Sequence, residues 1–86
     1  MMPLVSAQEF KRLSIYKRLM VLRYHGEVLA VRRYMANEIF LYRVGDYFAE
    51  AWFRFGTNDL TAIELVHSDY QINQYIDQID ITDLLK

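Results

Sequence analysis

The stretch RVGDYFAEAWFRF, residues 43–55, decides the fold, because it predicts a tight hairpin between two strands rich in apolar side chains. Gly45 and Asp46 separate these strands, and Gly in the first place of a two-residue loop is the signal of a type II′ turn. A loop of this length fixes the pairing, so we expect Val44 opposite Tyr47. Each further step along the hairpin then places side chains alternately on the two faces of a sheet.

Two further strands extend the hairpin. Residues 27–35 are predicted as the strand before 38–44, and residues 60–67 as the strand after 47–55. The connections between these segments are short, and short connections join antiparallel neighbours. We therefore expect a four-stranded antiparallel meander in chain order.

A long helix is predicted before the sheet. Ser6 and Glu9 form a capping box, so the helix is expected to run from Ala7 to Tyr24, with Gly26 just beyond its end. One side of this helix carries Phe10, Leu13, Tyr16, Met20, Val21 and Tyr24, and the opposite side carries Ile15, Leu19 and Leu22. A helix that is apolar on two sides needs two neighbours, here the sheet and either the last helix or a second subunit.

A shorter helix is predicted after the sheet. Ser68 and Gln71 form a second capping box. The apolar residues that follow at helical spacing are Ile72, Tyr75, Ile76 and Ile79. We expect the last apolar residues, Ile81, Leu84 and Leu85, to dock on the body of the protein. The predicted fold class is α+β, a single domain over residues 1–86 with both helices on one face of the sheet.

The two faces of the predicted sheet differ in composition. Ala49, Ala51 and Ala62 lie near the middle of one face, where their small side chains let a helix approach closely. The other face, named the Arg/aromatic face below, mixes charges with large apolar groups: Arg32, Tyr34, Ile39, Leu41, Arg43, Phe48, Glu50, Trp52, Arg54, Ile63, Leu65 and His67. An exposed apolar patch rich in Tyr, Trp and Arg is typical of a protein interface. We expect Arg43 to pair with Glu50 across the hairpin.

Composition excludes several classes of protein. The chain has 86 residues, 53% of them hydrophobic, and contains no cysteine. A disulfide scaffold, a thiolate zinc site and a cysteine nucleophile are therefore excluded. No apolar run approaches the roughly 20 residues that span a membrane. We expect a cytoplasmic protein without a membrane segment.

Charge is distributed unevenly along the chain. Residues 1–33 hold seven Lys or Arg against two Glu, whereas residues 34–86 hold three Lys or Arg against nine acidic residues. We favour internal charge complementarity between the two parts. The alternative is a basic patch for nucleic acid, formed by Lys11, Arg12, Lys17, Arg18 and Arg23.

Catalytic and metal-binding patterns are weak. Glu50 and His67 are the best available acid/base pair, but the sequence places no nucleophile beside them. His25 and Glu27 offer two ligands, whereas a metal site needs at least three. We therefore expect no cofactor and no metal; the sequence leaves an enzymatic role undecided and favours a protein that is not an enzyme.

The chain resembles a group of small bacterial proteins of unknown function. These proteins have an N-terminal helix, a GxxLAxR strand, an LYxxxD[FY][FY]xExW hairpin and a final ID[IL]x[DE]L segment. The matching residues here are Gly26, Leu29, Ala30, Arg32, Leu41, Tyr42, Asp46, Tyr47, Phe48, Glu50, Trp52, Ile79, Asp80, Ile81, Asp83 and Leu84. The resemblance covers most of the chain and implies no activity or cofactor.

A weaker resemblance is to the RelE-type ribosome-dependent toxins, which are small ribonucleases built from helices and an antiparallel sheet. In that likeness Arg32, Tyr34, Arg43 and Arg54 match the basic and aromatic residues of the exposed sheet face. The net charge of −1 departs from the strongly basic character of those toxins.

The sequence thus favours a small interaction module over an enzyme. We expect a homodimer, or a complex with another protein, formed through the Arg/aromatic face or the first helix. The alternative is a nucleic-acid-associated protein that uses the basic residues of the first helix and the sheet.

Overall fold

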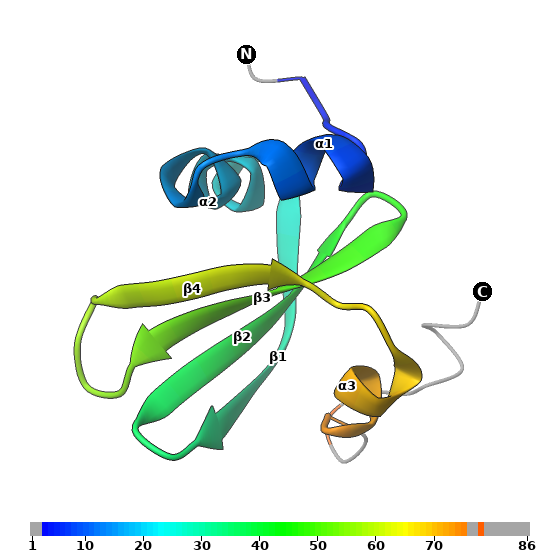
Figure 1. The fold of residues 1–86 in the computed structure, drawn as a ribbon. Coiled ribbons are helices and arrows are strands. Elements are labelled where there is room, and N and C mark those ends of the chain that lie inside the picture. Colours follow the sequence, from blue (N-terminus) through cyan, green and yellow to red (C-terminus); the bar gives the residue numbers. More distant parts are fainter. Residues whose placement is uncertain (1–2, 76–77, 79–86) are drawn as a thin grey trace.

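The computed structural model describes residues 3–75 and 78. Its elements form three layers, with one sheet in the middle and helices on both sides (Figure 1). In chain order they are α1 (Ala7–Arg12), α2 (Ile15–His25), β1 (Gly26–Tyr34), β2 (Asn37–Val44), β3 (Tyr47–Arg54), β4 (Leu60–Leu65) and α3 (Asp69–Asn73). The strands form one antiparallel sheet in the order β1-β2-β3-β4. The predicted α+β class and the meander are confirmed.

The hairpin register is also confirmed. Val44 pairs with Tyr47, and Leu41 pairs with Glu50 in the middle of the two strands. Gly45 has a φ of +56°, a left-handed conformation that glycine adopts without steric cost. The two-residue turn therefore fixes which side chains of β2 and β3 share a face.

The prediction of one N-terminal helix was wrong, because the chain breaks between α1 and α2. Leu13 and Ser14 are both extended, with ψ angles of 152° and 163°. The Ser14 hydroxyl accepts a hydrogen bond from the Lys17 N–H at 3.3 Å and so caps the second helix. The apolar periodicity continues on both sides of the break, which is why the pattern alone predicts a single helix.

Arg18 holds the two helices and the sheet together. Its Nε donates to the Phe10 carbonyl at 3.2 Å and its Nη2 to the Lys11 carbonyl at 2.6 Å, both near the end of α1. Its Nη1 donates to the Ile63 carbonyl of the outer strand β4 at 2.6 Å. One guanidinium therefore satisfies carbonyls at a helix end and on an outer strand.

Replacing Ser14 by Ala tests the cap of α2. We expect Ser14→Ala to lower the free energy of unfolding by about 1 kcal/mol, because the Lys17 N–H loses its partner. Ser68→Ala is the matched control, since Ser68 precedes α3 without a side-chain cap hydrogen bond. Urea denaturation measures both, and equal costs for the two variants would contradict the assignment.

α1 and α2 cover one face of the sheet. Phe10, Val21 and Leu22 are buried there. They pack on Ala49 and Ala51, whose small side chains let the helices approach, as predicted. Burying a large apolar side chain stabilises the folded protein by roughly 1.5–3 kcal/mol. Because more buried apolar residues gather on this face than under α3, it holds the main hydrophobic core.

α3 lies on the opposite face of the sheet, and the prediction of both helices on one face is corrected here (Figure 1). A second cluster forms there from Ala30, Leu41 and Tyr75, with Ile72 packed against it. The predicted capping box is absent as well. The Ser68 side chain makes no cap hydrogen bond, and the Gln71 side chain accepts from the His67 N–H at 2.7 Å instead of from the Ser68 N–H. Ile76, Ile79, Ile81, Leu84 and Leu85 lie outside the described residues.

Register shifts alter the predicted faces at both outer strands. Between β3 and β4 the pairing slips after Trp52, so that Ala62 lies opposite Trp52 and Ile63 opposite Ala51. Because side chains alternate, this slip sends Ile63 and Leu65 to the face of α1 and α2 and Ala62 to the other face. A second shift lies in β1 at Leu29, and this residue packs against the cluster under α3.

The outer edge of β1 is covered by a side chain. The amide of Gln78 accepts from the Val31 N–H at 3.0 Å and donates to the Val31 carbonyl at 2.5 Å. It thus takes the place of a neighbouring peptide group. Arg18 occupies a carbonyl of the other outer strand, β4, in the same way. Both contacts use backbone groups that could otherwise pair with a strand of another molecule.

Candidate functional site

The structure divides the residues of the predicted Arg/aromatic face into three sets. Ile39, Leu41 and Glu50 are on that face but are fully buried, so they do not form an open surface. Ile63 and Leu65 belong to the opposite face. The members that keep exposed or partly exposed side chains are Arg32, Tyr34, Arg43, Phe48, Trp52, Arg54 and His67. The Trp52 side chain points away from α1 and α2, as the alternation predicts.

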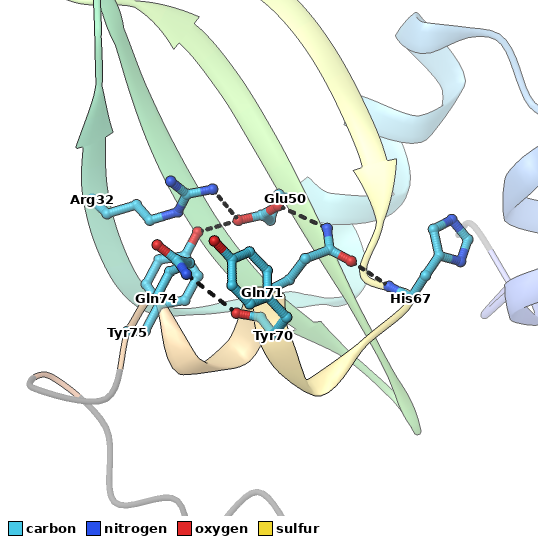
Figure 2. Close-up of polar contacts among 7 residues, drawn as sticks. All are labelled: Arg32, Glu50, His67, Tyr70, Gln71, Gln74 and Tyr75. Carbon is cyan, nitrogen blue, oxygen red and sulfur yellow. Dashed lines mark hydrogen bonds and ion pairs between the residues drawn. The ribbon is translucent and has the colours of Figure 1, made fainter.

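The centre of this face is a buried carboxylate with three donors, named the Glu50 cluster (Figure 2). Arg32 Nη2 donates to Glu50 at 3.3 Å, from β1 to β3. Gln71 Nε2 in α3 donates to it at 3.2 Å, and the Tyr75 hydroxyl, just beyond α3, donates at 2.5 Å. The cluster therefore ties the C-terminal segment to the sheet by charge-assisted hydrogen bonds.

Tyr75 is held as a hydrogen-bond donor. Burial raises the pKa of its hydroxyl well above the ordinary value, and its hydrogen bond to the Glu50 carboxylate raises the pKa further. A tyrosinate beside a buried carboxylate is disfavoured by desolvation and by like charge. The hydroxyl therefore stays protonated across the physiological range.

This shift predicts a loss of stability in alkali. A folded-state pKa above the unfolded value of about 10 means that the contribution is complete below pH 10 and declines as pH rises through the folded pKa. Tyr75→Phe removes the hydroxyl and is expected to cost about 1–2 kcal/mol near neutral pH. The difference between the two proteins, measured by urea denaturation, is expected to shrink above pH 10; a constant difference would contradict the assignment.

Glu50 and His67 do not form an acid/base pair. The two are linked only through Gln71, which accepts from the His67 backbone and donates to Glu50. Figure 2 shows the imidazole of His67 on the far side of Gln71 from the carboxylate. Arg43 does not pair with Glu50 as predicted; its guanidinium lies 5.8 Å from the centre of the Phe48 ring, and Glu50 pairs with Arg32.

A small pocket, named the Trp52 pocket, adjoins the Glu50 cluster. Its volume is about 230 Å³. It is lined by Arg32, Tyr34, Trp52, Tyr70, Gln71 and Gln74. The Arg32 guanidinium lies 5.7 Å from the centre of the Trp52 ring and 5.4 Å from that of Tyr75, so it is stacked between two aromatic side chains.

The basic residues that the sequence suggested for nucleic-acid binding differ in their environment. Arg18 is engaged by three backbone carbonyls, whereas Lys11, Arg12, Lys17 and Arg23 are exposed on α1 and α2. Lys11 and Arg18 also line a polar hollow of about 360 Å³ with Glu64, Leu65 and His67. Glu64 offsets part of the positive charge at that place.

No protein-family model, curated protein or solved structure matches this chain. Both resemblances drawn from the sequence therefore stay predictions. Within residues 3–75 and 78, no helix is long and apolar enough to cross a membrane. In the same part of the chain, no group of three His, Cys, Asp or Glu side chains is arranged to hold a metal ion.

Sequence reasoning missed the partners of Glu50. Gln71 and Tyr75 were expected to cap and bury the last helix, and nothing in their spacing links them to a carboxylate 21 and 25 residues earlier. The signal that was available is Glu50 itself, an acidic residue in the middle of an apolar strand. A buried carboxylate in such a position requires donors from elsewhere in the fold.

Proposed function

We propose that the protein is a small interaction module that forms a weak homodimer through α2. The observation that carries this proposal is a row of large side chains on the outer face of that helix. Tyr16, Met20 and Tyr24 are 76%, 39% and 61% exposed, while Val21 and Leu22 on the inner face are buried. Residues four apart lie one above the other on a helix, so the three form a continuous stripe about 12 Å long.

The spacing of this stripe suits a second copy of the same chain. Tyr16 and Tyr24 lie at equal distances on either side of Met20. If two α2 helices pack antiparallel about a two-fold axis at Met20, each Tyr16 meets the partner's Tyr24 and the two Met20 side chains meet each other. Such self-complementarity is what an isologous dimer requires.

The charges beside the stripe weaken such a dimer without preventing it. Lys17 and Arg23 flank Met20 on opposite sides of the stripe. In the antiparallel arrangement the two Lys17 side chains lie on the same side, about 9 Å apart along the helix axis. Salt screens charges at this separation, so the dimer is expected to become tighter as salt is added.

The Arg/aromatic face supports dimerisation less well than α2. Its apolar residues Ile39 and Leu41 are fully buried, and α3 packs on the same face. Part of the surplus apolar surface that the sequence assigned to a partner is thus covered within the chain, although Phe48 and Trp52 stay partly exposed. The stripe on α2 has no such cover in the described residues.

Sedimentation velocity from low micromolar to millimolar protein tests the proposal. We expect a reversible monomer–dimer equilibrium that Met20→Lys weakens by about tenfold or more, because it places two cations at the axis. Met35→Lys is the matched control, since Met35 is 85% exposed on the turn between β1 and β2.

Two outcomes would contradict the proposal. One is a monomer at every concentration, and the other is a dimer that Met20→Lys and Met35→Lys affect equally. Association of the protein with an acidic partner or a nucleic acid is distinguished by its salt dependence, because such a complex weakens as salt is added.

A further inference from the structure

The Trp52 pocket is lined by flat aromatic side chains and amides, and two of its lining residues hold a buried nitrogen that has no hydrogen-bond partner in the described part of the chain. Tyr34, Trp52 and Tyr70 provide the aromatic surface. Among the described residues, the indole Nε1 of Trp52 and the Nε of Arg32 are buried nitrogen donors without a hydrogen-bond partner. Such unpaired donors are uncommon in folded proteins, because each costs roughly 1–3 kcal/mol.

The amides at the rim add both donors and acceptors. Gln74 donates from Nε2 to the Tyr70 carbonyl at a long 3.4 Å, which leaves its Oε1 available to a ligand. Gln71 uses its Oε1 and one amide N–H within the fold, and its second N–H is available. An occupant that matches this pocket therefore carries both acceptors and donors at the edge of a flat ring.

Charge excludes the ionic classes of occupant. Arg32 is paired with Glu50 at 3.3 Å, so its charge is offset and the pocket is not a site for a simple anion. Arg32 already stands over the Trp52 ring, so a cationic ligand would meet a like charge at the same aromatic face. Among neutral occupants, a planar ring with polar edges matches the aromatic lining and the amides at the rim.

We infer that the Trp52 pocket binds one unpaired nucleobase. Bases stack on aromatic side chains, and amide side chains read their edges. The volume of about 230 Å³ holds a single ring system and lies below the range for larger ligands. The base belongs either to a free nucleotide or to a single strand, and both present the same ring.

Trp52 is the only tryptophan of the chain, so its fluorescence reports on the pocket directly. We expect adenosine and uridine to change this fluorescence in a saturable way, beyond the collisional quenching of free N-acetyltryptophanamide. Ribose 5-phosphate, which lacks a base, is expected to give no change. A short oligonucleotide that binds more tightly per base than the free nucleoside identifies a strand as the source, and equal affinities identify the nucleotide.

Variants locate the binding. Tyr70→Ala is expected to weaken nucleoside binding by about tenfold, because Tyr70 contributes a stacking surface. Tyr70 is 74% exposed, so its removal leaves the fold intact, as near-ultraviolet circular dichroism will check. Tyr16→Ala is the matched control, with a comparable exposure of 76% on α2.

Three results would overturn the inference. They are the absence of saturable quenching up to the solubility limit of both nucleosides, a response to ribose 5-phosphate as large as that to the nucleosides, and equal affinities in Tyr70→Ala and the parent protein. None of these readouts depends on dimerisation, so the inference stands or falls independently of the proposed function.

Discussion

Phe10→Ala is expected to lower the free energy of unfolding by about 4 kcal/mol, the largest effect of any substitution considered for this protein. Phe10 is fully buried between α1 and the sheet. Its ring lies 5.6 Å from that of Tyr47 and 5.7 Å from the Arg18 guanidinium. The change therefore removes apolar burial, leaves a cavity and removes the ring beside the Arg18 guanidinium, while the three backbone carbonyls that accept from Arg18 remain.

Urea denaturation of Phe10→Ala and Phe55→Ala measures this effect. Phe55 is the matched control because it is 46% exposed and contacts the Arg33 guanidinium at 3.5 Å from its ring centre. We expect Phe55→Ala to cost about 1 kcal/mol. Comparable losses in the two variants would contradict the placement of the core. If Phe10→Ala does not fold, Phe10→Leu preserves most of the volume and keeps the comparison measurable.

Glu50→Ala is expected to cost about 3 kcal/mol, which corresponds to a fall in melting temperature of roughly 12–24 °C for a domain of this size. The loss has two parts. Three hydrogen bonds disappear, and the Arg32 guanidinium keeps its charge with no carboxylate beside it. Because the Arg32 side chain is 17% exposed, water partly replaces the lost partner, and we expect the lower end of the range for a broken buried pair.

Glu64→Ala is the control for Glu50→Ala. Glu64 lies directly opposite Glu50 across β3 and β4, but its side chain is exposed. A surface substitution of this kind changes stability by about 0.5 kcal/mol or less. Similar melting temperatures for the two variants would show that the Glu50 cluster does not anchor the C-terminal segment. A double-mutant cycle with Arg32→Ala is expected to give a coupling of at least about 1 kcal/mol.

The strands were predictable because their signals are local. A two-residue turn and a period-two alternation involve neighbours in sequence, so the pairing of β2 with β3 and the outward direction of Trp52 follow without tertiary information. The same reasoning failed at β4. The register slip between β3 and β4 depends on how the chain after Arg54 turns back to pair with β3. No residue type in that loop predicts the slip.

The helices were predictable in type and less so in extent and position. Ser14 looked like an interior residue of one helix because apolar spacing continues through it, but its hydroxyl caps a new helix. The face covered by α3 was not predictable either. Both faces of the sheet carry apolar side chains. An amphipathic stripe indicates that one side of a helix is buried, but it does not indicate which face of the sheet covers that side.

By itself, the sequence determined the α+β class, the order of the strands and the alternation that separates Ala49 from Trp52, because each depends on residues a few positions apart. Only the tertiary structure decided that α3 covers the face opposite α1 and α2, and that Arg32, Gln71 and Tyr75 converge on Glu50. The reason is that a buried carboxylate is satisfied by whichever donors the chain brings to it in space, and distance along the sequence sets no limit on where those donors come from.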